Sequence, residues 1–191
     1  MPKIGIVTVL YKSDAVLDDF FKSISCQNYT NYILYIIDNS ATPESKQLVF
    51  EYSSKYKILN HIVYLPSEDN IGVAAGNNVG ILAAQKDNCE YVLLSNNDIL
   101  IQDEDLFGNM ISEIESKKIK ILIPKIHFYD SNEIWFISGY INKFRAKCFH
   151  TNNYKVDNGQ FDYLTECTYA PTCFMLFHKS VFEKIGLMDE K

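Results

Sequence analysis

The chain has 191 residues, of which 47% are hydrophobic and 22% are charged. This composition predicts a globular chain that is long enough to bury a sizeable core in one domain. Acidic residues outnumber basic ones, and the net charge of −6 at pH 7 argues against a surface that binds nucleic acid.

The five cysteines are odd in number and irregular in spacing, without a C-x-x-C pair. We therefore expect neither a disulfide framework nor a zinc site, and several of the thiols lie in apolar stretches typical of a core. Such cysteine usage fits a reducing cytoplasm. The first residues lack the pattern of a signal peptide, and no apolar run is long enough to span a membrane. These features predict a cytoplasmic protein.

Strand patterns alternate with helix patterns over the first 125 residues. Apolar, β-rich runs predict strands at residues 4–10, 32–37, 61–65, 91–95 and 119–123. Helices are expected after Ser13 as an N-cap, from Pro43 to about Tyr56, around Val79, Leu82 and Ala83, and around Phe107, Met110, Ile111 and Ile114. The alternation predicts an α/β fold with a mostly parallel sheet and helices on both faces.

The pattern changes after about residue 125 and becomes strand-like and mixed. Turn residues stand at 130–132 and 152–153, an apolar run covers 172–177, and a short helix at 180–184 is expected to end at Gly186. A basic stretch holds Lys143, Arg145 and Lys147, with His150 close by. It predicts either a solvated hairpin or a cationic patch that faces phosphate. Nothing after the last helix closes a fold, so we expect the natural chain to continue past Lys191.

Polar residues collect where the first four predicted strands end. In an open parallel sheet these ends share one rim, where ligands bind. Four such ends in sequence predict a site. The residues are Thr8 and Tyr11, then Asp38, then Asn70 and Gly72, then Asn96 and Asp98.

Each of these residues has a functional and a structural interpretation. Asp98 is a hard oxygen ligand suited to Mg²⁺ or Mn²⁺ and hence to a diphosphate, or it closes a turn that caps the next helix. Asp38 accepts a hydrogen bond from the imide N–H of a base, or it forms an Asx turn. Tyr11 lies against a base, or it packs at the rim.

Glycines at positions 72, 76 and 80 belong to the Gly/Asn-rich stretch that leads into the third predicted helix. Their spacing matches neither a P-loop nor the G-x-G-x-x-G fingerprint. Gly76 and Gly80 predict close packing of this helix on the sheet. The neighbouring asparagines are too polar for packing alone, and we expect them to contact a ligand; they are Asn70, Asn77 and Asn78.

Taken together, these segments resemble an inverting family 2 glycosyltransferase with a GT-A fold, of the rhamnosyltransferase-like branch. The resemblance covers nearly the whole chain in the family's order. It is carried by Ile37-Asp38-Asn39-Ser40, by Leu94-Ser95-Asn96-Asn97-Asp98, and by residues 6–11, 70–77, 135–139, 170–176 and 182–190.

The resemblance implies a Rossmann-like, mostly parallel sheet with a mixed C-terminal part, in one GT-A domain over residues 1–191. Residues 1–125 would bind the donor, and residues 126–191 would begin the acceptor half. Asp38 would contact uracil or thymine, with Thr8 and Tyr11 lining the base pocket. Asn70, Gly72 and Asn77 would belong to the nucleotide region. Asn96, Asn97 and Asp98 would stand at the family's D-x-D motif, with Asp98 holding Mn²⁺ or Mg²⁺.

The implied activity moves a sugar from a UDP- or dTDP-sugar to a glycan or lipid-linked acceptor, with inversion, in bacterial surface polysaccharide synthesis. Peripheral membrane association is compatible with such an acceptor. The sequence departs from the family where Asn96 replaces the first aspartate and where Pro171-Thr172 replaces Gly-Ala. The usual general base would lie beyond Lys191, so Asp189 is the nearest catalytic candidate within the chain.

Three other functions compete with this interpretation. A non-catalytic nucleotide-binding module would bind the donor without turnover. A sugar nucleotidyltransferase needs a glycine-rich loop after the first strand, where this chain has Tyr11-Lys12-Ser13-Asp14. A Rossmann dehydrogenase needs the glycine fingerprint that the chain lacks.

Overall fold

The computed structural model describes residues 1–40 and 42–191. These residues form two compact units. The first comprises Met1–Leu122 together with Cys173–Lys191, and the second comprises Ile123–Thr172. Within the described part of the chain, no helix is long and apolar enough to cross a membrane.

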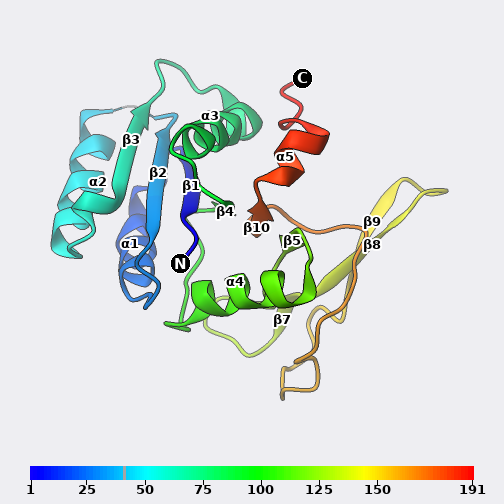
Figure 1. Cartoon of the computed structure of the whole chain (residues 1–191). Coiled ribbons are helices and arrows are strands. Elements are labelled where there is room, and N and C mark those ends of the chain that lie inside the picture. Colours follow the sequence, from blue (N-terminus) through cyan, green and yellow to red (C-terminus); the bar gives the residue numbers. More distant parts are fainter. Residues whose placement is uncertain (41) are drawn as a thin grey trace. The chain divides into compact units, whose positions relative to one another are not determined.

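A six-stranded sheet forms the centre of the first unit (Figure 1). Strands β1 to β4 run parallel to one another, and β10 inserts antiparallel between β4 and β5. The order across the sheet is β3-β2-β1-β4-β10-β5. The predicted mostly parallel α/β sheet is therefore confirmed. The strands are β1 (Ile4–Leu10), β2 (Tyr32–Asp38), β3 (Ile62–Pro66), β4 (Tyr91–Ser95), β5 (Ile121–Leu122) and β10 (Phe174–His178).

Helices cover both faces of this sheet, as predicted. The α3 glycines lie against Val7 and Ile37 on one face. On the other face, α2 and α4 meet the alternate residues of β2, through Asp38 and Tyr32 respectively. Figure 1 shows α2 and α3 on opposite sides of β2. The α-helices are α1 (Leu17–Ser25), α2 (Pro43–Lys55), α3 (Gly72–Lys86), α4 (Leu106–Lys117) and α5 (Ser180–Ile185), and short 3-10 turns span Asp14–Val16 and Leu59–His61.

Most predicted element boundaries hold within one or two residues. The four apolar positions predicted for α4 are all buried, Thr42 and Ser45 form a capping box at the start of α2, and α5 ends at Gly186 with a φ of 80°. The fifth strand is shorter than predicted, because only two residues pair with β10.

The prediction for the start of α1 was wrong. A 3-10 turn comes first, the α-helix begins only at Leu17, and the Ser13 side chain makes no capping hydrogen bond. Its hydroxyl instead accepts a hydrogen bond from Asn97 Nδ2 at 3.3 Å. Ser13 therefore joins the end of β1 to the end of β4.

The predicted apolar face of α3 was also wrong. Val79 and Leu82 are 39% and 52% exposed, and the buried side of the helix instead includes Gly76, Gly80 and Ile81. A Cβ added to Gly80 would lie 2.3 Å from Val7 Cγ1, and one added to Gly76 would lie 2.9 Å from Val9 Cγ2. The backbone of α3 lies so close to β1 that only glycine fits there, which confirms the packing role of both glycines.

The cysteines are free thiols, but they are less buried than predicted. Only Cys89 is fully buried, and Cys173 is half-buried. The other three are exposed, which corrects the assignment of several thiols to the core; they are Cys26, Cys148 and Cys167.

The second unit consists of two small antiparallel sheets, β6 with β7 and β8 with β9. Its buried centre includes Ile134 and Phe136. The basic stretch lies on the β8–β9 hairpin, so the hairpin prediction is confirmed. The strands are β6 (Ile126–His127), β7 (Ile134–Phe136), β8 (Ser138–Asn142) and β9 (Lys147–Thr151).

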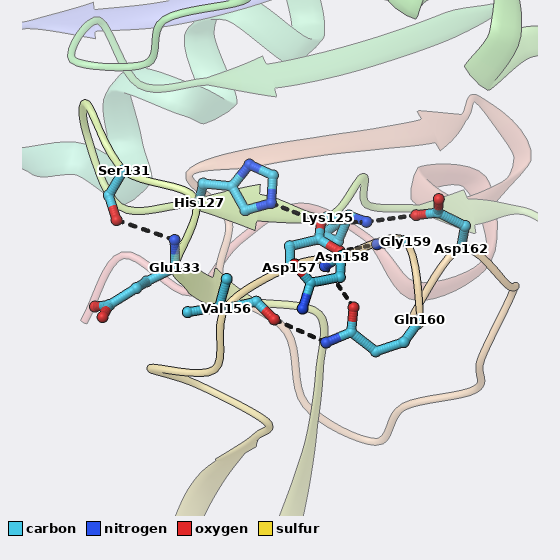
Figure 2. Close-up of polar contacts among 10 residues, drawn as sticks. All are labelled: Lys125, His127, Ser131, Glu133, Val156, Asp157, Asn158, Gly159, Gln160 and Asp162. Atoms are coloured by element: carbon cyan, nitrogen blue, oxygen red, sulfur yellow. Dashed lines mark hydrogen bonds and ion pairs between the residues drawn. The ribbon is translucent and has the colours of Figure 1, made fainter.

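Charged side chains tie the loop after β9 to the strand β6 (Figure 2). Lys125 Nζ lies 2.5 Å from a carboxylate oxygen of both Asp157 and Asp162. His127 Nε2 lies 2.8 Å from Asp157 Oδ2. Hydrogen bonds from Lys125 and then His127 lower the pKa of Asp157 to about 2. The Lys125 ammonium and the hydrogen bond from His127 thus favour the ionised form of this loop carboxylate.

Candidate functional site

A cavity of about 350 Å³ opens in the first unit, where the parallel strands end. Its lining comes from the segments that follow β1, β2, β3 and β4, so the predicted convergence at one rim is observed. Six of the predicted site residues line it: Tyr11, Asn70, Gly72, Asn96, Asn97 and Asp98. The remaining lining residues are Val9, Ser13, Asn39 and Val73.

Backbone and amide hydrogen bonds fix the segment after β4. Asn96 N–H donates to the Cys173 carbonyl at 2.7 Å, and Asn97 Nδ2 donates to the Val9 carbonyl at 2.9 Å. The side chains of Asn96 and Asp98 are left exposed at the cavity. The turn does not cap the next helix, because α4 begins only at Leu106.

The second predicted carboxylate, Asp38, is fully buried at the end of β2. Its Oδ1 accepts a hydrogen bond from Ser40 N–H at 2.9 Å, as in an Asx turn. Its Oδ2 accepts from Ser45 Oγ at 2.5 Å and from Tyr64 OH at 2.7 Å. Burial, followed by the hydrogen bond to Asp38, raises the pKa of Tyr64. The Asx-turn interpretation therefore describes the structure, while a contact of Asp38 with a base stays a prediction.

The neighbouring Asn39 lines the cavity although it is only 5% exposed. Its Nδ2 donates to Asn70 Oδ1 and to the Gly72 carbonyl, both at 3.2 Å. Because the Gly72 carbonyl can only accept, the orientation of the Asn39 amide is fixed. Its Oδ1 has no hydrogen-bond partner among the described residues. A buried acceptor without a donor is costly, so an N–H or O–H of a ligand or a water is needed to complete its hydrogen bonding.

Sequence reasoning used Asn39 only as part of a motif and missed it as a site residue. The available signal was its place in the polar stretch after β2, directly beside Asp38. Adjacent residues near a strand end turn to opposite faces, so the choice between the two depended on the fold.

The first turn of α3 also borders the cavity, through Gly72 and Val73. Gly72 has a φ of 82°, a conformation that glycine adopts without strain. The N–H groups of a first helical turn have no partners within the helix and favour anions. Asn70 Oδ1 accepts one of them, from Gly72 at 3.0 Å. The cavity thus joins a helix N-terminus to a nearby carboxylate.

Four predicted site residues lie outside the cavity lining, namely the buried Asp38 described above and three others. Thr8 is buried in β1, and its hydroxyl has no partner among the described residues. Asn77 is buried in α3. Asp189 is exposed and accepts a hydrogen bond from Lys191 N–H at 3.0 Å.

A further residue, Asn78, was expected to contact a ligand and instead holds the C-terminal segment. Its Nδ2 donates to the Met188 carbonyl at 2.9 Å and to Glu190 Oε1 at 2.7 Å. Its Oδ1 accepts from Met188 N–H at 2.9 Å. These bonds use both ends of the amide, which accounts for a polar residue on the buried side of α3.

Asp98 is the one charged residue among the described residues that line the cavity. Burial raises the pKa of the Cys173 thiol to about 11, and the negative charge of Asp98 adds to this shift. Among residues 1–40 and 42–191, no group of three histidine, cysteine or acidic side chains could hold a metal ion. The cavity therefore offers one carboxylate with amide groups around it, rather than a complete metal site.

Comparison with known proteins identifies the class. The model of the family described as "Glycosyl transferase family 2" matches residues 5–186. The sheet and the likeness to the solved structures below define a GT-A fold. The chain belongs to glycosyl transferase family 2. A comparison with curated proteins gave no match.

Two solved structures show the likeness of fold. One is the mannosyltransferase PcManGT from Pyrobaculum calidifontis in complex with GDP-Man and Mn²⁺, with 13% identity and a TM-score of 0.68; the match covers 100% of this chain and 48% of that one. The other is S. aureus TarS 1-349 in complex with UDP, with 16% identity and a TM-score of 0.68, covering 98% and 50%. The chain thus spans about half the length of these proteins.

Proposed function

We propose that the cavity binds the nucleoside diphosphate part of a sugar donor, and that the chain takes part in transferring the sugar to a glycan or lipid-linked acceptor. The observation that carries the proposal is the meeting of three groups at one cavity. These are the Asp98 carboxylate, the N-terminus of α3 and the unpartnered Oδ1 of Asn39. The GDP-Man and UDP named for the two solved structures support it.

The chemistry of the lining suggests how the donor would lie. Peptide N–H groups at the start of α3 suit the diphosphate. The half-exposed ring of Tyr11 suits the flat face of a base. Asn39 Oδ1 is an acceptor, so it would meet a donor such as an imide N–H or a ribose hydroxyl. Asp38, buried one residue earlier, would reach a base only if its bonds to Ser45 and Tyr64 were exchanged.

A divalent cation fits this site only together with the diphosphate. Mg²⁺ is commonly held by one or two carboxylates plus substrate phosphates and waters, and Asp98 supplies one carboxylate. Mn²⁺ favours the same oxygen ligands. Bound there, the ion would neutralise charge on the leaving diphosphate. The proposal therefore requires that metal binding depend on nucleotide.

The finer parts of the function are proposals as well. Inversion requires a base that deprotonates the acceptor hydroxyl, and Asp189 is our candidate within the chain. We also propose the rhamnosyltransferase-like branch, a UDP- or dTDP-linked donor and a role in bacterial surface polysaccharide synthesis. A lipid-linked acceptor would bring the chain to a membrane surface as a peripheral protein.

Calorimetric titration with UDP, dTDP, GDP and NAD, each with and without Mn²⁺, tests the proposal. We expect UDP or dTDP to bind, Mn²⁺ to tighten the binding, and Mn²⁺ alone not to bind. Asp98→Asn should remove the Mn²⁺ effect. Glu51→Gln, which makes the same change on the exposed surface of α2, should leave it intact. If no nucleotide binds, or if only NAD binds, the proposal is wrong.

Release of free nucleotide from the donor separates transfer from binding. Asp189→Asn should keep donor affinity and lose turnover if Asp189 is the base. A chain that binds donor but shows no turnover, with or without acceptor, would instead be a nucleotide-binding module. Unchanged turnover in Asp189→Asn would remove that residue from the mechanism.

A further inference from the structure

The tip of the β8–β9 hairpin carries an aromatic ring that is fully exposed. Phe144 is 104% exposed, and Tyr140 and Ile141 behind it are 48% and 44% exposed. A single exposed apolar side chain needs no explanation, but here Tyr140 and Ile141 lie on opposite faces of β8, so that Phe144 and these two residues form an apolar patch on both sides of the hairpin end. Such a patch indicates a surface that becomes covered by a partner.

The hairpin holds this patch in a fixed shape. Its strands pair from Ser138 opposite Thr151 to Asn142 opposite Lys147. At the turn, Arg145 N–H donates to the Asn142 carbonyl at 3.2 Å and to its Oδ1 at 3.1 Å. The rings of Tyr140 and Phe149 stack across the strands at 5.1 Å. The tip is therefore an ordered protrusion, and a partner would meet it without the entropic cost of ordering a loop.

The base of the hairpin is fixed as well. Ile141 N–H donates to Thr168 Oγ1 at 3.0 Å, and the Gly139 carbonyl accepts from Thr168 N–H at 3.0 Å. These bonds anchor β8 to Thr168, which belongs to the same unit. The hairpin is therefore tied to the rest of the second unit.

Cationic residues flank Phe144 in the sequence of the hairpin. Lys143, Arg145 and Lys147 are exposed, and none of them forms an ion pair within the part of the chain that is described. Residues 134–156 contain four lysine or arginine residues and no acidic residue, a local charge of +4 in a chain of −6. The hairpin is therefore positively charged although the net charge of the protein is negative, and this charge suits an anionic partner.

We propose that the β8–β9 hairpin docks the protein on an anionic lipid bilayer. Phe144 enters the boundary between headgroups and acyl chains, while Lys143, Arg145 and Lys147 contact lipid phosphates. A bilayer surface supplies an anionic layer directly above an apolar one, which matches a ring set among cations. A soluble polyanion would satisfy the cations and leave the ring in water. This docking is separate from the donor cavity and is measurable without any nucleotide.

Vesicle flotation tests the proposal on the whole chain. Vesicles of phosphatidylcholine alone should not carry the protein, whereas vesicles that also contain phosphatidylglycerol should, and added salt should release it. The triple variant Lys143→Gln/Arg145→Gln/Lys147→Gln should bind on the order of 100-fold more weakly, at about fivefold per cation. Phe144→Ala should bind about tenfold more weakly, since it loses a buried phenyl group.

The matched control is a second exposed triplet of lysines at and after the end of α4. The variant Lys117→Gln/Lys118→Gln/Lys120→Gln removes the same charge from another part of the surface and should bind like the wild type. Far-UV circular dichroism and nucleotide titration of every variant show that the first unit is folded and working. A failure of nucleotide binding therefore bears on the donor site, and a failure of flotation bears on the hairpin.

Insertion of the ring has its own readout. The single native tryptophan is Trp135, so Phe144→Trp in a Trp135→Phe background places the only tryptophan at the tip, where it can be excited apart from the tyrosines. Brominated lipids should quench it. Absence of quenching, absence of vesicle binding, or an equal loss in the lysine control would each overturn the proposal. The proposal would also be overturned if soluble polyphosphate displaced the protein from the vesicles and Phe144→Ala bound the vesicles as tightly as the wild type. That result would assign the hairpin to a soluble polyanion.

Discussion

Replacing Gly80 by alanine would test how closely α3 lies to the sheet. The new Cβ would meet Val7 Cγ1 at 2.3 Å, Val7 Cγ2 at 3.0 Å and Ile37 Cδ1 at 2.8 Å. Carbon atoms pack favourably at about 3.5 Å or more, so α3 would have to move by roughly 1.2 Å. Rotating Val7 gives no relief, because both of its methyl groups lie within the contact and its χ1 angle is stiff.

The net effect combines two opposing terms. Overpacking a core costs about 1–3 kcal/mol, and a contact this short belongs at the upper end. Alanine gains about 1 kcal/mol over glycine in a helix interior. We therefore expect Gly80→Ala to lower the free energy of unfolding by about 2 kcal/mol. Because the first turn of α3 borders the cavity, nucleotide binding should also weaken.

Urea denaturation followed by far-UV circular dichroism measures this change. Gly108→Ala in α4 is the matched control, since its Cβ would meet only Tyr29 Cδ2, at 3.8 Å. That variant should be more stable than the wild type by about 0.5–1 kcal/mol. If Gly80→Ala is stabilised like Gly108→Ala, the close approach of α3 to β1 is refuted.

Three further predictions concern other parts of the chain. The folded pKa of Asp157, about 2, lies below its usual 3.8, so the stability it adds is present above about pH 4 and lost as the pH falls toward 2. The fluorescence of Trp135, which lies in the same unit, should report this loss. Lys125→Met should lower the free energy of unfolding by about 2 kcal/mol near neutral pH and abolish most of its acid dependence. An unchanged acid transition in this variant would contradict the assignment. Burial raises the thiol pKa of Cys89 and Cys173. Iodoacetamide should therefore label the three exposed cysteines first, as measured by peptide mass spectrometry. Early labelling of Cys173 would argue against its burial. Asn78→Ala removes three hydrogen bonds from the C-terminal segment, so limited proteolysis there should be about tenfold faster, and equal rates would show that other contacts hold the segment.

Local sequence patterns were enough to predict most elements of the sheet. Strands β1, β2 and β4 are continuous apolar runs buried on both faces, and such runs are typical of parallel strands under helices. The place of β10 was not predictable in this way. An apolar run near residues 172–177 indicates a strand, but its insertion between β4 and β5 depends on contacts distant in sequence.

Helix α3 shows where hydrophobic periodicity fails. Its exposed side carries Val79 and Leu82, and its buried side carries Gly76 and Gly80. A pattern based on apolar side chains assigns the wrong face when the packing is between backbones. The glycine spacing was the better signal, and it did predict the close approach.

The sequence by itself determined the family, the alternation of strands and helices, and the rim on which the polar strand ends gather. The reason is that all three depend on residue types in a fixed order along the chain. The tertiary structure decided which of two adjacent polar residues, Asp38 or Asn39, lines the cavity. Neighbouring side chains point to opposite faces of a strand. Only the packing of α2 and α3 on those faces determines that Asp38 is enclosed, and that the Oδ1 of Asn39 has no hydrogen-bond partner among the described residues.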